Sequence, residues 1–114
     1  MALKPLTYED PLFLLLRDGN VKEFNARKAQ GETAQFRDCN FRYLDLRGLG
    51  AEGIDFSNSY FRAADLRGID FSTTHLAGAR LNGARISGAL FPAELVPAEI
   101  ELSINRGTRL RYRK

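Results

Sequence analysis

Arginine and tyrosine are the side chains of this sequence best suited to chemistry, and that chemistry is binding. Arg42, Arg47, Arg62 and Arg67 each directly follow an apolar residue, and Tyr60 lies among them. Arginine together with tyrosine is typical of the hot spots of protein interfaces. Arginine also binds phosphate through its planar fork of donors. These residues therefore indicate a binding surface, provided that the fold brings them to one side of the molecule.

Residues for catalysis or metal binding are scarce. The one histidine, His75, is predicted to be exposed, and the one cysteine, Cys39, to be a buried and inert thiol. No cysteines and histidines stand at the spacing of metal ligands. The glycines suit tight corners better than a phosphate-binding loop before a helix. We therefore expect no enzyme activity, no cofactor and no metal.

The composition is that of one small domain. The chain has 114 residues and a net charge of +3, from 17 Lys and Arg against 14 Asp and Glu. No apolar run approaches the ~20 residues of a membrane-spanning helix, and the N-terminus lacks the pattern of a signal peptide. The single cysteine cannot form an internal disulfide, which is typical of a reducing compartment. We expect a cytoplasmic protein with no membrane partner, either a monomer or a weak dimer.

An apolar residue at every fifth position is the strongest pattern in the sequence. Twelve consecutive positions share this period, and Ala51 is the only small residue among them. A helix would spread such residues around its circumference, and a flat strand would send alternate ones to opposite sides. The chain must therefore turn a corner once per repeat. We predict that the other eleven residues form the core: Phe36, Phe41, Leu46, Phe56, Phe61, Leu66, Phe71, Leu76, Leu81, Ile86 and Phe91.

This pattern resembles the pentapeptide repeat proteins. The stretches "AADLRG" (63–68) and "AGARLNGARISGALF" (77–91) carry the resemblance most plainly, and it extends over residues 34–93. The resemblance implies an all-β solenoid, a right-handed quadrilateral β-helix with four repeats per coil and about three coils. We therefore expect residues twenty positions apart to stack on one another.

The two ends of the chain are predicted to be helical. Asp10 and Asn20 are each suited to cap a helix, so residues 10–30 read as an α-hairpin that covers the first coil. Pro97 is suited to begin a short helix that ends near Asn105. The predicted organisation is a helical cap over 1–33, a repeat region over 34–93, and a capping helix with a basic tail over 94–114. The alternation of residues 109–113 predicts a short edge strand.

The four-repeat coil sorts the outward residues into faces. One face carries Arg42, Tyr60, Arg62 and Arg80 together with Asn40 and Asn82, and it has no acidic residue. We call these six residues the arginine face. The adjoining face mixes Asp45 and Asp65 with Arg85, and it adds Arg47 and Arg67 near the shared corner. The candidate binding residues are Arg42, Tyr60, Arg62 and Arg80 of the arginine face, Arg47 and Arg67 beside it and, in the tail, Arg109, Arg111 and Arg113.

Three functions remain open. The first is a non-catalytic protein-interaction module with an unknown protein partner. The second is the binding of anions or nucleic acid through the arginine face and the basic tail. The third is a gyrase-binding DNA mimic, as in some members of the resembled family; it is disfavoured because residues 34–93 carry seven positive and six negative side chains.

Overall fold

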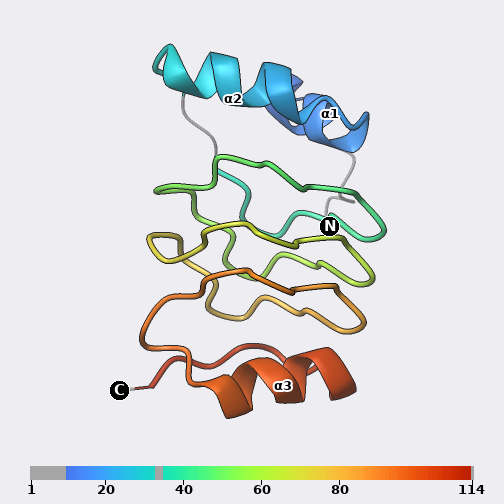
Figure 1. Cartoon of the computed structure of the whole chain (residues 1–114), viewed down its shortest axis with the longest axis vertical. Coiled ribbons are helices and arrows are strands. Elements are labelled where there is room, and N and C mark those ends of the chain that lie inside the picture. Colours follow the sequence, from blue (N-terminus) through green and yellow to red (C-terminus); the bar gives the residue numbers. More distant parts are fainter. Residues whose placement is uncertain (1–9, 33–34, 114) are drawn as a thin grey trace, which may run out of the picture.

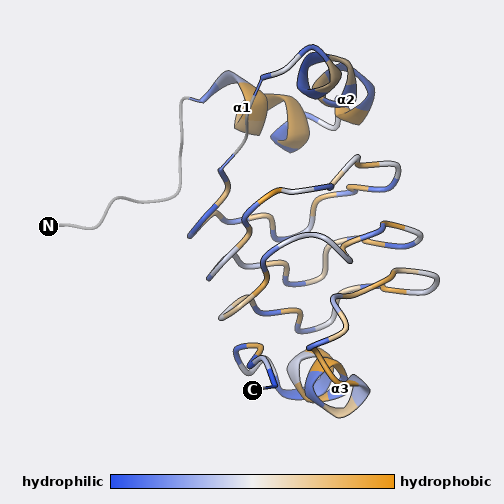
Figure 2. Cartoon of the chain, turned by 90° about the vertical axis from the view of Figure 1, so that its left-hand side faces the viewer, coloured by the Kyte–Doolittle hydropathy of each residue, from blue (hydrophilic) through white to orange (hydrophobic). Residues whose placement is uncertain are grey.

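The computed structural model describes residues 10–32 and 35–113. Helices α1 (Pro11–Arg17) and α2 (Val21–Ala29) lie over one end of a stack of coils, and helix α3 (Pro97–Arg106) lies at the other end (Figure 1). Figure 2 shows the same stack from the side, with hydrophobic and hydrophilic residues alternating along each coil. None of the helices in the described ranges is both long and apolar enough to cross a membrane.

The repeats end in corners, and most of these corners are closed by a backbone hydrogen bond. The amide of Leu49, for example, donates to the carbonyl of Leu46 at 3.0 Å, and Gly48 between them has a φ of 86°. A positive φ at the third residue is what a type II turn requires, which explains why glycine recurs there. Tyr43 and Ala63 occupy the same place in their repeats with φ values of 63° and 56°.

Residues twenty positions apart stack in three levels. Parallel bridges join Asn40 to Tyr60 and Tyr60 to Arg80, and the same step joins other residues of the repeats. The bridges found in the described residues are Gln35–Asp55, Asn40–Tyr60, Asp45–Asp65, Asp55–His75, Tyr60–Arg80, Asp65–Arg85 and Asp70–Leu90. This stacking places equivalent repeat positions above one another on each side of the molecule.

The prediction of an all-β solenoid, a right-handed quadrilateral β-helix, is wrong. Within residues 10–32 and 35–113 there is no β-strand and no sheet, and the regular elements are the three helices. Extended pairing is confined to isolated single-residue bridges. The physical reason is the corner in every repeat, because a turn after so few extended residues leaves no run long enough to form a strand.

The core is a column of side chains inside the coils. Nine of the eleven predicted core residues are buried, and Phe56 lies at ring-centroid distances of 6.0 Å from Phe36 and 5.5 Å from Phe61. Ile86 and Phe91 are only half-buried. They line a shallow groove together with Ile100 and Ile104, because α3 covers only part of the last coil.

Helices α1 and α2 cover the first coil more completely than α3 covers the last coil. The Asp10 carboxylate accepts a hydrogen bond from the Leu12 amide at 2.9 Å, and Asn20 accepts one from the Glu23 amide at 3.4 Å, so each caps its helix. The apolar sides of both helices are buried against the coil through Leu12, Phe13, Leu16 and Phe24. Both helices lie within the predicted 10–30 hairpin.

The C-terminal tail is not the predicted edge strand. Its backbone pairs with the third coil around Leu110 without forming a strand. The Leu110 amide donates to the Ala79 carbonyl and the Gly78 amide donates to the Leu110 carbonyl, each at 2.8 Å. Helix α3 ends at Arg106, one residue beyond the predicted Asn105, and Gly107 is its C-cap. The division into 1–33, 34–93 and 94–114 stays a prediction, and residues 1–9, 33–34 and 114 lie outside the described residues.

Candidate functional site

The arginine face forms on one side of all three coils. Bridges stack Asn40, Tyr60 and Arg80 in one column. Beside it, the Tyr43 amide donates to the Arg62 carbonyl at 2.8 Å, and the Ala63 amide donates to the Asn82 carbonyl at 3.0 Å. Arg42, Arg62 and Asn82 therefore stack in a second column, as the sequence predicts for this side.

The arginines of this face have no carboxylate partner among the described residues. Arg42, Arg62 and Arg80 are all exposed, and none of them takes part in an ion pair there. The Asn40 side-chain oxygen accepts a hydrogen bond from the Arg42 amide at 3.0 Å, which fixes the backbone without neutralising the guanidinium. The face is thus cationic, with its charge directed to solvent.

Two tyrosines lie among these cations. Tyr43 is 63% exposed, and the guanidinium carbon of Arg62 lies 6.0 Å from the centre of its ring. Side-chain hydrogen bonding with Asn82, and then with Arg62, lowers the pKa of Tyr60. Sequence reasoning missed Tyr43; the available signal was a bulky residue at a corner position where half of the repeats have glycine. Such a residue with a positive φ is unusual and strained.

The adjoining face neutralises two of its three arginines, Arg47 and Arg67. We call Asp45, Arg47, Asp65, Arg67 and Arg85 the aspartate–arginine face. Arg47 contacts Asp45 through two hydrogen bonds of 2.9 and 2.7 Å, and Arg67 contacts Asp65 through two of 2.8 and 2.6 Å. The hydrogen bonds from Arg67, helped by the positive charges of Arg67 and Arg47, lower the pKa of Asp65 to about 2. The predicted binding residues Arg47 and Arg67 are therefore engaged within the molecule.

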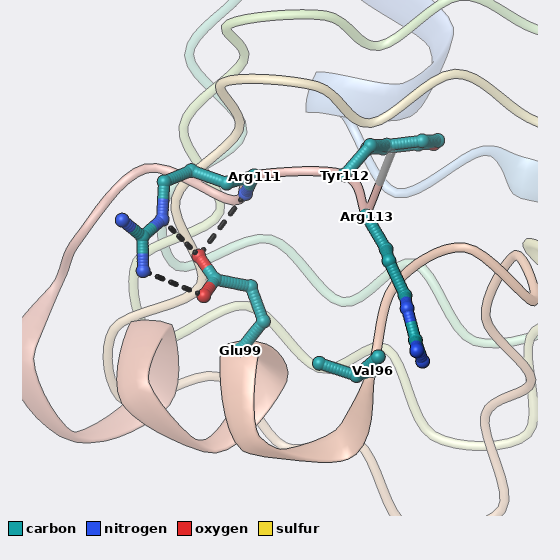
Figure 3. Close-up of a pocket in the computed structure, with 5 residues that line it drawn as sticks. All are labelled: Val96, Glu99, Arg111, Tyr112 and Arg113. Carbon is teal, nitrogen blue, oxygen red and sulfur yellow. Dashed lines mark hydrogen bonds and ion pairs between the residues drawn. The ribbon is translucent and has the colours of Figure 1, made fainter.

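The three tail arginines separate from one another. Arg109 donates to the Asn58 side-chain oxygen and to the Gly78 carbonyl, both at 3.3 Å, at the corner that leads into the arginine face. Arg111 instead makes three hydrogen bonds to Glu99 of α3, and Arg113 extends away from that carboxylate (Figure 3). Only Arg109 thus lies beside the arginine face. The Arg111–Glu99 pairing lowers the pKa of Glu99.

Groups able to do other chemistry lie apart. His75 is exposed and Cys39 is buried. In the part of the chain that the structure describes, no three His, Cys, Asp or Glu side chains come together as metal ligands would. The candidate site that the structure assembles is therefore the arginine face, which is cationic and partly aromatic.

Comparison with known proteins supports the repeat pattern. A family model for pentapeptide repeats matches residues 54–91, where it finds eight copies. No curated protein and no solved structure matches the chain. The matched repeats build much of the second and third coils, including Tyr60, Arg62 and Arg80 of the arginine face. The match confirms the resemblance seen in the sequence for residues 54–91, which are pentapeptide repeats.

Proposed function

We propose that this repeat-protein module is non-catalytic and binds another protein through the arginine face. One observation carries the proposal: Arg42, Arg62 and Arg80 have no carboxylate partner in the described residues, whereas Arg47 and Arg67 on the next face do. Exposed arginines next to tyrosines have the composition of an interface hot spot. The strained and exposed Tyr43 adds an aromatic anchor to the same surface.

Rigidity supports the same proposal. The backbone behind the face is fixed by bridges to the next coil and by a buried aromatic core. A surface that is already ordered loses little conformational entropy when a partner binds. The aspartate–arginine face is less suited, because a partner would first have to displace the carboxylates that Arg47 and Arg67 already hold.

The test is affinity capture with two charge-matched variants. The whole chain is immobilised and exposed to an extract of the cells that make it, and bound proteins are identified. Arg42→Gln/Arg62→Gln/Arg80→Gln should lose its specific partners. The control Arg47→Gln/Arg67→Gln/Arg85→Gln removes an equal number of charges and should keep the specific partners. An unchanged set of partners with the first variant would remove the arginine face from consideration.

Binding of anions or nucleic acid is the second candidate, favoured by the position of Arg109 beside the arginine face. Phosphate contacts release counterions, so four such contacts with a single strand would give a slope of roughly −3 for log affinity against log salt concentration. A titration with single-stranded DNA at two salt concentrations measures that slope. For the protein-binding proposal we expect weak DNA binding. We also expect no inhibition of gyrase, since a DNA mimic needs a dense anionic surface.

A further inference from the structure

We propose that the partner presents a short, extended, acidic segment whose carboxylates bind Arg42, Arg62 and Arg80. This inference rests on the proposed function, because it names the chemistry of the partner at the same face. It follows from a comparison of equivalent positions in neighbouring repeats, from the size of the face, and from its surroundings.

The arginine face lacks two carboxylates that its neighbour has. Arg42 and Arg47 hold the same place in consecutive repeats, as do Arg62 and Arg67. Two positions before Arg47 and Arg67 stand Asp45 and Asp65, which bind them bidentately. Two positions before Arg42 and Arg62 stand Asn40 and Tyr60.

The neighbouring face thus shows which ligand suits an arginine at this position. Its Arg–Asp pairs are planar, charge-assisted contacts of the kind that guanidinium groups form with carboxylates. Arg42 and Arg62 present the same donors, with no carboxylate of the described residues in place. A partner that supplies carboxylates would complete on the arginine face the contacts that the aspartate–arginine face makes internally.

The size of the face selects a short segment. Paired backbones lie ~4.8 Å apart, so the outer two of three stacked levels are separated by roughly 10 Å. An extended chain advances ~3.3 Å per residue, so about four residues cross the stack. A standard interface between globular proteins takes up about 800 Å² on each partner, and a specific DNA interface more than that. The six residues of this face suit a peptide better than a globular surface or a duplex.

The surroundings give the segment a direction. Asp38 is exposed at the first-coil corner that precedes Asn40, and its carboxylate repels another acidic group. At the equivalent corner lower in the stack, Arg109 contacts Asn58 and Gly78 and adds a fourth cation. The most acidic part of the segment should therefore lie toward Arg80 and Arg109, with an apolar or aromatic residue toward Tyr43.

The experiment uses fluorescence anisotropy with the whole chain and an eight-residue labelled peptide of alternating Glu and Ser. A peptide of alternating Gln and Ser and an eight-nucleotide oligo(dT) are the comparison probes. We expect the Glu peptide to bind and the Gln peptide not to bind. Arg42→Gln/Arg62→Gln should weaken binding of the Glu peptide at least tenfold. The matched control Arg47→Gln/Arg67→Gln should change it less than twofold.

Three results would overturn the inference. Equal weakening by both variant pairs would show attraction to net charge alone. Tighter binding of oligo(dT) would assign the face to nucleic acid. A Glu peptide that does not bind would contradict the inference directly. If capture still depends on Arg42, Arg62 and Arg80 in that last case, the proposed function stands and only the acidic segment is wrong. If capture does not depend on them, the proposed function fails on its own.

Discussion

The arginine face and the aspartate–arginine face carry arginines at the same repeat positions but differ in what those arginines contact. On the aspartate–arginine face, Arg47 and Arg67 are held by Asp45 and Asp65. On the arginine face, Arg42 and Arg62 have Asn40 and Tyr60 at the corresponding places. Under the proposed function, the comparison teaches that a binding surface depends on the absence of an internal carboxylate and not on the number of arginines.

The largest effect should come from breaking the core that holds both faces. Phe56 is fully buried, with its ring centre 5.8 Å from that of Phe41 and 5.9 Å from that of Phe71. Phe56→Ala should lower the free energy of unfolding by about 3–5 kcal/mol, because it removes apolar contacts and leaves a cavity. Denaturant unfolding measures this value. A loss below about 1 kcal/mol would mean that the faces do not depend on the aromatic column.

The next effect should come from making the arginine face resemble its neighbour. Asn40→Asp keeps the shape of the side chain and its contact with the Arg42 amide, but adds a carboxylate beside Arg42. A charge pair at about 4 Å contributes ~1 kcal/mol in water, so affinity for the Glu peptide should fall about fivefold. Anisotropy titration checks this, with Asp38→Asn as a variant expected to act in the opposite direction. Unchanged affinity with Asn40→Asp would contradict the role of the missing carboxylate.

A smaller effect should follow when the aspartate–arginine face is opened. Asp45→Asn/Asp65→Asn retains acceptors for the Arg47 and Arg67 amides but releases their guanidinium groups. The chain should then offer a second cationic surface, and the number of Glu peptides bound per chain should rise from one to two. Titration at high protein concentration gives that number. A ratio that stays at one would show that charge pairing is not what separates the two faces.

The smallest effect concerns stability at low pH. The pKa of Asp65 is about 2 in the folded chain, below its ordinary value of 3.8, so the unfolded chain takes up a proton first as the pH falls. The contribution of Asp65 is present above pH ~4 and is lost between pH ~4 and ~2. Melting temperatures of the native chain should therefore fall more steeply across this range than those of Asp65→Asn. Parallel curves would contradict the strong pairing of Asp65 with Arg67.

Much of the interior could be predicted from the sequence because the period of five is unbroken. Phe56, Phe61 and Leu66 recur with small or charged neighbours, and only an inward direction accounts for their spacing. Ile86 follows the same period but is half-buried, because its exposure depends on how far α3 covers the last coil, which no repeat specifies. The all-β class was wrong because the period fixes the corners and the stacking but not the length of the extended runs between them.

The candidate site was predictable only in part. The predicted stacking of residues twenty positions apart brought Arg42, Arg62 and Arg80 to one side. It could not show which arginines already have carboxylate partners. Glu99 binds Arg111 across the turn from α3 to the tail, and Arg109 reaches a corner 51 residues away in the sequence. Those contacts depend on where the tail lies, which a repeat pattern does not determine.

Nuclear magnetic resonance of the whole isotope-labelled chain, titrated with the Glu peptide, tests the central claim most directly. The amide and guanidinium signals of Arg42, Arg62 and Arg80 should shift in proportion to peptide bound, while those of Arg47 and Arg67 stay in place. Shifts that are as large on the aspartate–arginine face, or that are centred on the groove beside α3, would contradict the claim that arginines without internal carboxylates form the binding surface.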